Sequence, residues 1–254
     1  MVKKILSIVL WVLTAAALVV LFVFARKNYL DTPLKTIQLL PSTDTGFVRK
    51  TALHDELAQL CGKSDIGTVN MIAIQNHLNS NPWIEDNASY IDLDGTLNVS
   101  FKEYEPQFRV FGKDGRSVYV TCDGIVIPSS SIYTPYVLIA SGNFDIKKDT
   151  TAYKLCDTLT SDQNLLNALH WTKAIEGNPF IKNCVGQLYC NSRNQFELTV
   201  RGLEARVIVG DTCIAADKLK RLETFMKQRI DKPETKTLKS INLNYKNQIV
   251  CTKR

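Results

Sequence analysis

The sequence predicts an α+β ectodomain in two parts behind one N-terminal transmembrane helix, and three observations carry this prediction. An uninterrupted apolar run lies close to the amino terminus, from Ile5 to Phe24. After it, helical and strand-like periodicities alternate, with no internal repeat and no low-complexity tract. At Pro106 a strand–helix–helix–strand–strand order gives way to short strands separated by turns.

The apolar run contains one polar residue, Thr14. At 1.5 Å per residue it forms a helix of about 30 Å, the thickness of a bilayer hydrocarbon core. A cleaved signal peptide is the alternative, but its apolar core is normally shorter and is followed by small residues, whereas Ala15–Ala17 lie inside the run. We therefore expect an uncleaved membrane anchor at residues 5–24, represented by the apolar residues Ile5, Trp11, Leu21 and Phe24.

Charge says little about orientation, because two basic residues flank the run on each side. The short head at residues 1–4 favours a cytoplasmic stub, with the bulk of the chain outside the inner membrane. Four of the 31 basic residues flank the run, so the remainder, which holds the 25 acidic residues, is nearly neutral. No stripe of Lys and Arg follows, so nucleic-acid binding is not expected.

A polar linker is predicted at residues 25–34, followed by a first domain at 35–106. Its first strand is expected at 36–40. A helix is predicted with Thr51 as N-cap and Gly62 as the closing residue. The apolar face of this helix consists of Leu53, Leu57, Leu60 and Cys61.

A second helix and a β-hairpin complete the predicted first domain. The helix carries Met71, Ile74 and Leu78 on one face and stops before Asn81-Pro82. Residues 87–93 are joined to the next strand by Asp94-Gly95, a strong hairpin signal. In that last strand the apolar residues alternate with polar ones, which predicts one buried face formed by Leu97, Val99 and Phe101.

The second domain, predicted at residues 107–254, is β-rich with flanking helices. Short strands are expected at 107–111, 117–120, 125–128, 137–140, 185–191, 195–200 and 206–209. One helix runs from Asp162 to near Gly177, and a later one carries the apolar face Leu219, Leu222, Met226 and Ile230. The chain closes with two strands, at 237–245 and 248–253.

Catalytic, metal and cofactor sites are not predicted. The seven cysteines include no C-x-x-C pair, and the three histidines do not lie at zinc-ligand spacing from them. Most cysteines are expected to be buried free thiols, although Cys184 and Cys190 could pair in an oxidising compartment. A thiol-dependent hydrolase or oxidoreductase acting through Cys122 or Cys213 is the enzymatic alternative. It would need an activated thiolate, for which neither flanking sequence shows a pattern. The sequence thus favours binding over turnover, with no cofactor and no small-molecule substrate.

Several short motifs occur along the chain in the same order as in one known family. They are Asn81-Pro82-Trp83-Ile84, Thr96-Leu97, Glu105-Pro106, Val118-Tyr119 followed by Asp123-Gly124 and Pro128, and the terminal strands Ile241–Tyr245 and Gln248–Cys251. In this order, behind one anchor, the chain resembles the FtsQ/DivIB family of bacterial cell-division proteins, most closely the Bacteroidetes-type members. The resemblance implies a cytoplasmic tail, a membrane helix, a POTRA domain and a β-rich domain. The chain departs from the family pattern at Tyr104, Asn242 and Asn244, where the family tends to carry charged residues.

The resemblance also implies a function and a site. Members of this family are non-enzymatic scaffolds of the septal division complex, and the small bitopic proteins FtsB and FtsL dock on their terminal strand region. Carried onto this sequence, the site is Ser240, Ile241, Leu243 and Tyr245. A partner strand could pair with the free backbone groups of that sheet edge. Two alternatives stay open: an ordinary buried hairpin, and a POTRA-bearing accessory of outer-membrane protein assembly or secretion.

Overall fold

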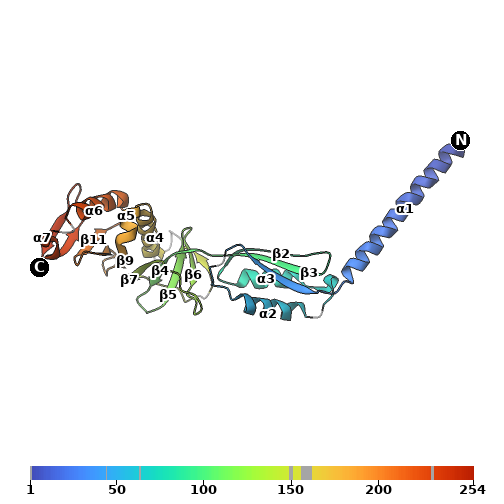
Figure 1. The fold of residues 1–254 in the computed structure, drawn as a ribbon, viewed down its shortest axis with the longest axis horizontal. Coiled ribbons are helices and arrows are strands. Elements are labelled where there is room, and N and C mark those ends of the chain that lie inside the picture. The colour runs from blue at the N-terminus through green and yellow to red at the C-terminus, as the bar shows by residue number, and fades with distance from the viewer. Residues whose placement is uncertain (1, 44, 63, 149–150, 156–161, 230–231) are drawn as a thin grey trace. The chain divides into compact units, whose positions relative to one another are not determined.

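The computed structural model describes residues 2–43, 45–62, 64–148, 151–155, 162–229 and 232–254, with the backbone alone for residues 2–8. The chain divides into two compact units, Met1–Glu103 and Tyr104–Arg254 (Figure 1). The architecture is mixed α+β, with one apolar helix at the amino terminus, a three-stranded sheet in the first unit and a ten-stranded sheet in the second.

The amino-terminal helix α1 runs from Val2 to Leu30 and is longer than the predicted anchor. Residues 25–30, expected to belong to a linker, continue the helix. The hydroxyl of Thr14 donates to the carbonyl oxygen of Trp11 over 2.9 Å, so the one polar side chain in the apolar run is satisfied within the helix. A connector of residues 31–35 then leads to the first strand.

The rest of the first unit has the predicted order of strand, helix, helix, strand and strand. Its elements are β1 (Thr36–Pro41), α2 (Lys50–Cys61), the short 3-10 helix η1 (Ile66–Thr68), α3 (Met71–Ser80), β2 (Ile84–Ile91) and β3 (Thr96–Glu103). The sheet order is β1-β3-β2, with β1 parallel and β2 antiparallel to β3. Because β3 is central, β1 and β2 are both edge strands.

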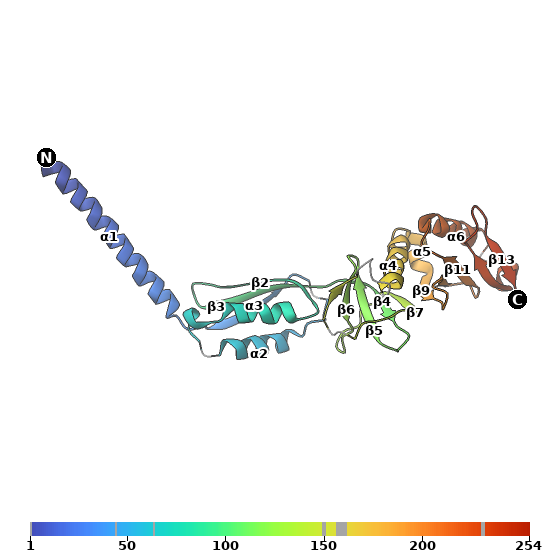
Figure 2. The same cartoon turned by 180° about the vertical axis from the view of Figure 1, so that it is seen from behind.

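The core of the first unit lies between this sheet and the two helices (Figure 2). The predicted buried face of β3 is confirmed, since Leu97, Val99 and Phe101 are all buried. They pack against buried residues of the two helices, namely Leu53, Leu57, Ile74 and Leu78. The turn between β2 and β3 is also confirmed, with Gly95 at φ 91°, a conformation that favours glycine.

Two details of α2 differ from the prediction. The residue preceding the helix is Arg49, not Thr51, and it makes no side-chain cap. Leu60, assigned to the apolar face, is exposed, because the buried stripe is confined to Leu53, Leu57 and Cys61. The predicted end is confirmed, since Gly62 at φ 57° donates its N–H to the carbonyl oxygen of Ala58.

The second unit is built on a sheet of ten strands in the order β13-β12-β11-β10-β9-β7-β4-β5-β6-β8. The strands are β4 (Pro106–Phe111), β5 (Ser117–Thr121), β6 (Ile125–Pro128), β7 (Leu138–Gly142), β8 (Tyr153–Lys154), β9 (Val185–Cys190), β10 (Phe196–Val200), β11 (Arg206–Gly210), β12 (Leu238–Asn242) and β13 (Val250–Lys253). Its helices are α4 (Gln163–Glu176), α5 (Pro179–Cys184), α6 (Ala215–Arg229) and α7 (Pro233–Lys236). Of these, β8, α5 and α7 were not predicted.

One hydrophobic core holds the second unit together, formed by the sheet and the helices α4, α5 and α6. Trp171 of α4 is its largest fully buried side chain. The predicted face of α6 is confirmed at Leu219, Leu222 and Met226, whereas Ile230 lies outside the described residues. The three leucines predicted in α4 differ in their burial. Leu165 and Leu169 are buried, and Leu166 is partly buried against the same core.

The cysteines differ from their predicted role as buried apolar residues. All six described cysteines are free thiols, including the neighbours Cys184 and Cys190. Three of the six are exposed, namely Cys122, Cys213 and Cys251, and Cys156 lies outside the described residues.

Candidate functional site

The strand β13 forms one end of the ten-stranded sheet. It pairs with β12 on one side only, and no other described strand covers its second side. All four of its residues, Val250–Lys253, are exposed. Such an edge presents unpaired backbone N–H and C=O groups, which another extended chain can satisfy.

The opposite end of the sheet is β8, a strand of two residues. An edge this short offers little backbone for another strand to pair with. The two ends of the sheet therefore differ, and β13 is the end with room for strand addition.

The free edge of the sheet lies one strand further along the C-terminal hairpin than the predicted residues. The strand that carries the predicted residues is β12, and it is paired on both sides, in parallel with β11 and antiparallel with β13. Ile241 and Leu243 are fully buried in the core of the second unit. Neither their side chains nor the edge of β12 is open to a partner, because the sheet continues through β13.

The two other predicted residues lie nearer the surface. Ser240 is half-buried and lies level with Arg206 of β11 and Thr252 of β13. Tyr245 is 49% exposed and lies in the connection between β12 and β13. The structure thus separates the four predicted residues into two core residues and two that remain accessible beside the edge.

Arg221 on α6 fixes the connection between the two last strands. Its Nη1 donates to the carbonyl oxygens of Tyr245 over 2.8 Å and Gln248 over 2.9 Å, and its Nη2 donates to that of Leu243 over 3.1 Å. Its Nε donates to Asp217 over 3.0 Å. A planar guanidinium can serve several acceptors at once in this way, so one side chain holds both ends of the turn.

A second cation on α6, Lys218, ties the same turn to the end of β11. Its buried ammonium donates to the carbonyl oxygen of Val209 and to the carboxylate of Asp211, each over 2.8 Å. It also lies 3.4 Å from the side-chain oxygen of Asn244. The hydrogen bond from Lys218 lowers the pKa of Asp211 below its ordinary value of 3.8.

The two asparagines that depart from the family pattern serve this turn. The backbone N–H of Asn244 donates to Oδ1 of Asn242 over 3.0 Å. Gly210, at φ 69°, lies so close to Asn244 that an added Cβ would be 2.2 Å from its Oδ1. The connection before β13 is therefore packed and hydrogen-bonded by its own residues, without the ion pair that charged residues at these positions would allow.

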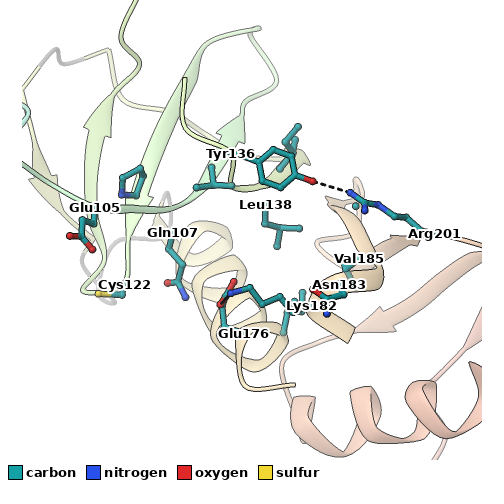
Figure 3. A pocket seen from close by; sticks show the side chains of 15 residues that line it. Glu105, Gln107, Cys122, Tyr136, Leu138, Glu176, Lys182, Asn183, Val185 and Arg201 are labelled. Carbon is teal, nitrogen blue, oxygen red and sulfur yellow. Dashed lines mark hydrogen bonds and ion pairs between the residues drawn. The ribbon is translucent and has the colours of Figure 1, made fainter. Parts of the chain in front are cut away.

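A groove of about 730 Å³ opens elsewhere in the second unit, beside the first residues of β4, β7 and β9. Figure 3 shows Gln107 and Leu138 directed into it, and Arg201 bonded to the hydroxyl of Tyr136 over 3.0 Å. Lys182 and Glu176 form an ion pair of 2.6 Å at another part of its wall. The lining is a mixture of aliphatic, amide and charged groups, of which Lys182, Glu176 and Arg201 take part in these contacts.

The enzymatic alternative would need an activated cysteine with a base such as histidine beside it. Among the described residues that line the groove, Cys122 is the only cysteine and none is a histidine. Burial and the neighbouring Asp123 raise the pKa of the Cys122 thiol, away from the thiolate form. Burial likewise raises the pKa of Cys190 to about 11. Within the described residues, no group of three or more histidine, cysteine and acidic side chains could hold a metal ion.

The anchor residues lie on α1. By length and composition its segment Val9–Leu30 could cross a membrane. The predicted anchor residues Trp11, Leu21 and Phe24 are all exposed along it, as a lipid-facing helix requires. Ile5 lies in the same helix, but its side chain is outside the described part of the chain.

One comparison with known proteins bears on this architecture. The family described as FtsQ/DivIB, C-terminal related, matches residues 105–252, which is more than half of the chain and nearly all of the second unit. No curated protein matches the sequence.

Proposed function

The chain belongs to the FtsQ/DivIB family, and from this membership we propose that it is a non-enzymatic scaffold of the bacterial cell-division complex. The family match spans β4 to β13 and includes the exposed edge strand. The family itself consists of division proteins without enzymatic activity. The single observation that carries the proposal is that no other described strand covers the outer side of β13, at the end of that matched domain.

The first unit is proposed to be a POTRA-like domain of residues 35–106, followed by the family's β-rich domain at 107–254. The order of strand, helix, helix, strand and strand supports this assignment, as does the packing of two helices on a sheet with central β3. Because the domain that directly follows this unit belongs to the FtsQ/DivIB family, a division protein is favoured over an accessory of outer-membrane protein assembly or secretion.

The protein is proposed to cross the cell inner membrane once through α1, with residues 1–4 in the cytoplasm and both folded units in the periplasm. The exposed apolar surface of α1 supports an anchor embedded in lipid. In this arrangement the docking edge works at the septal membrane, where the other components of the division complex also reside.

The proposed binding mode is the addition of a partner strand to β13. Backbone hydrogen bonds supply most of the affinity in such a contact, so it makes little demand on the side chains of the edge. Tyr245 and Ser240 are proposed to contribute at the margin of this surface, since both remain accessible. The proposed partners are the FtsB/FtsL-type bitopic proteins and other members of the division complex.

A pair of proline substitutions tests this mode. On an antiparallel edge strand the N–H groups of neighbouring residues point alternately toward the paired strand and away from it. Of Cys251→Pro and Thr252→Pro, one therefore removes a bond to β12, and the other removes only an outward donor. The outward variant should keep the wild-type thermal unfolding midpoint and lose co-purification with co-expressed FtsB/FtsL-type partners.

Matched side-chain variants provide the control. Cys251→Ser and Thr252→Val leave the backbone donors in place, so both should retain the partners. If a stably folded proline variant at each position still co-purifies with the partners as well as the wild type does, strand addition at β13 is wrong.

A further inference from the structure

The first unit has one end that is tied to the exit of the anchor helix. The hydroxyl of Tyr29 on α1 donates to the carbonyl oxygen of Ile91, the last residue of β2, over 3.3 Å. The N–H of Lys35 donates to the carbonyl oxygen of Gly95 in the β2–β3 turn over 2.8 Å. Gly95 also approaches the carbonyl oxygen of Pro33 so closely that an added Cβ would lie 2.6 Å from it. The β2–β3 turn is therefore fastened to the segment by which the chain leaves the membrane helix.

The loop around η1 is fastened to the same segment. Ile66 donates its N–H to the carbonyl oxygen of Thr32 over 2.9 Å, and Leu34 donates to that of Ser64 over 3.1 Å. The β2–β3 turn and the loop around η1 thus lie at the end of the sheet where β1 begins. In the sequence, the start of β1 follows shortly after α1.

Leu93, at the tip of the β2–β3 turn, is 84% exposed, more than any other leucine described in this unit. Its two acidic neighbours are held back against the hairpin. Asp92 accepts from the side-chain amide of Asn98 over 2.7 Å, and Asp94 accepts from the N–H of Thr96 over 3.0 Å. The apolar side chain is consequently the one that projects from this tip.

The distance along the helix places this tip near the lipid. If the hydrocarbon ends near Phe24, then Tyr29 lies five residues further, or about 7.5 Å along a helix with a rise of 1.5 Å per residue. The headgroup region of one leaflet is about 5–7.5 Å thick. The carbonyl oxygen of Ile91, bonded to Tyr29, therefore lies close to the outer boundary of the bilayer, and Leu93 follows two residues later in the chain, in the same turn.

We infer that Leu93 is a second membrane contact, which inserts into the interface of the bilayer that α1 crosses. The occupant is lipid and not a protein, because the turn is bonded to the anchor helix and its connector at the outer boundary of the headgroup region. The inference rests on α1 spanning the membrane but not on the proposed edge at β13. Such a contact would restrain the first unit against the membrane surface, as interfacial apolar groups do.

Charged residues of both signs lie near the β2–β3 turn. Lys35 lies beside Asp94, while Arg26 and Lys27 follow the apolar part of α1. With Asp31, which follows α1, the two acids of the turn balance these three cations, so the attraction is expected to depend on apolar burial more than on anionic lipid.

Tryptophan fluorescence of the full chain in lipid vesicles tests the inference. The native indole in the anchor is first removed with Trp11→Phe, and Leu93→Trp is added to this background. The matched control is Leu40→Trp, a 46% exposed leucine of β1. Leu40 pairs with Ser100, whereas the start of β1 pairs with Thr96 beside the turn, so the control lies about 13 Å further along the strand.

Vesicles of phosphatidylcholine brominated at carbons 6 and 7 of one acyl chain should quench the Leu93→Trp variant and shift its emission to the blue. The Leu40→Trp variant should lose no more emission than the Trp11→Phe background. Equal emission losses in the two variants would overturn the inference.

The same quenching measurement on the chain that retains Trp11 distinguishes two explanations of a negative result. Quenching of Trp11 without quenching at position 93 would show that the anchor is in the bilayer and that the hairpin tip is not. If Trp11 itself were not quenched, α1 would not be embedded, and both the anchor and the inference drawn from it would be wrong.

Discussion

Arg221 donates a hydrogen bond of 2.8 Å to the backbone carbonyl oxygen of Tyr245, across 24 residues of sequence. The same guanidinium reaches Leu243 and Gln248, so α6 holds the turn that leads into β13. The proposed docking edge is a terminal strand, and terminal strands fray unless they are tied down. We therefore expect this contact to keep β13 ordered at the end of the sheet.

Replacing Arg221 by alanine should destabilise the second unit by about 1.5–3 kcal/mol, the range for hydrogen bonds that involve a charged group. The side chain is 15% exposed, so water can replace its bonds to the three carbonyls only in part. The measurement is urea unfolding, combined with hydrogen exchange of the amides at residues 243–253, which should become faster.

Arg221→Lys is the matched variant. It keeps a positive charge near Asp217 but cannot present a planar fork to three carbonyl oxygens. It should recover only part of the lost stability. Unchanged exchange at residues 243–253 in Arg221→Ala would contradict the role given to this side chain.

The Lys218–Asp211 pair predicts a pH dependence of stability. The pKa of Asp211 is lowered by the hydrogen bond from Lys218, so the folded state binds fewer protons at this group than the unfolded chain does. Its stabilising contribution is therefore present above the ordinary value of 3.8 and is lost as the pH falls below it.

Free energies of unfolding measured between pH 5 and about pH 2.5 should show this loss in the wild type. In Asp211→Asn the slope over the same interval should be smaller, since amide groups do not titrate there. Identical slopes in the two proteins would show that Asp211 is not coupled to folding.

Glu103 provides a separate prediction for the first unit. This carboxylate is fully buried, and its Oε2 accepts from the backbone N–H of Phe47 over 2.8 Å and from the hydroxyl of Thr45. Glu103→Ala leaves a buried N–H without its acceptor, which costs about 1–3 kcal/mol.

The control in the same unit is Glu85→Ala, which removes a partly exposed ion pair of 2.8 Å with Lys102. Pairs of that kind contribute about 0–1 kcal/mol. Thermal unfolding should therefore separate the two variants, and equal effects would mean that burial of Glu103 does not govern its contribution.

Local patterns in the sequence predicted most of the elements. The alternation at Leu97, Val99 and Phe101 predicted the buried face of β3, and the spacing of Leu219, Leu222 and Met226 predicted that of α6. Each depends on a periodicity that a single element imposes on its own residues. The helix α5 was missed although its signals are present: Asn178 caps its first turn and Pro179 occupies its first position.

The position of the free edge could not be predicted in the same way. Alternation around Ile241 indicates which side chains are buried, but the strands that flank β12 are set by its parallel pairing with β11, about 30 residues earlier in the chain. Lys218 was missed for a related reason, since lysine is normally exposed. Its burial depends on oxygen acceptors at Val209 and Asp211 that only the folded sheet brings to it.

The thiols should react in an order set by their exposure. Cys122, Cys213 and Cys251 are exposed and should be alkylated in the folded protein, whereas Cys190 is buried with its pKa raised to about 11. Peptide mapping after brief treatment with iodoacetamide at pH 8 checks this order. Cys190 should be modified only after denaturation, and early modification there would contradict its place in the core.

Cys251 also allows the most direct test of the central claim, because this native thiol lies on β13. Residues directly opposed across paired strands have Cα atoms about 4.5–5.5 Å apart, within the range of a disulfide. In a Cys122→Ser, Cys213→Ser background, single cysteines are introduced along an FtsB/FtsL-type partner and the complex is mildly oxidised. If a partner strand adds to β13, Cys251 should form disulfides with partner cysteines near one position of the partner sequence, most strongly at every second residue. Crosslinks without this alternation would contradict docking at β13. The absence of crosslinks from a complex that still forms would contradict it as well.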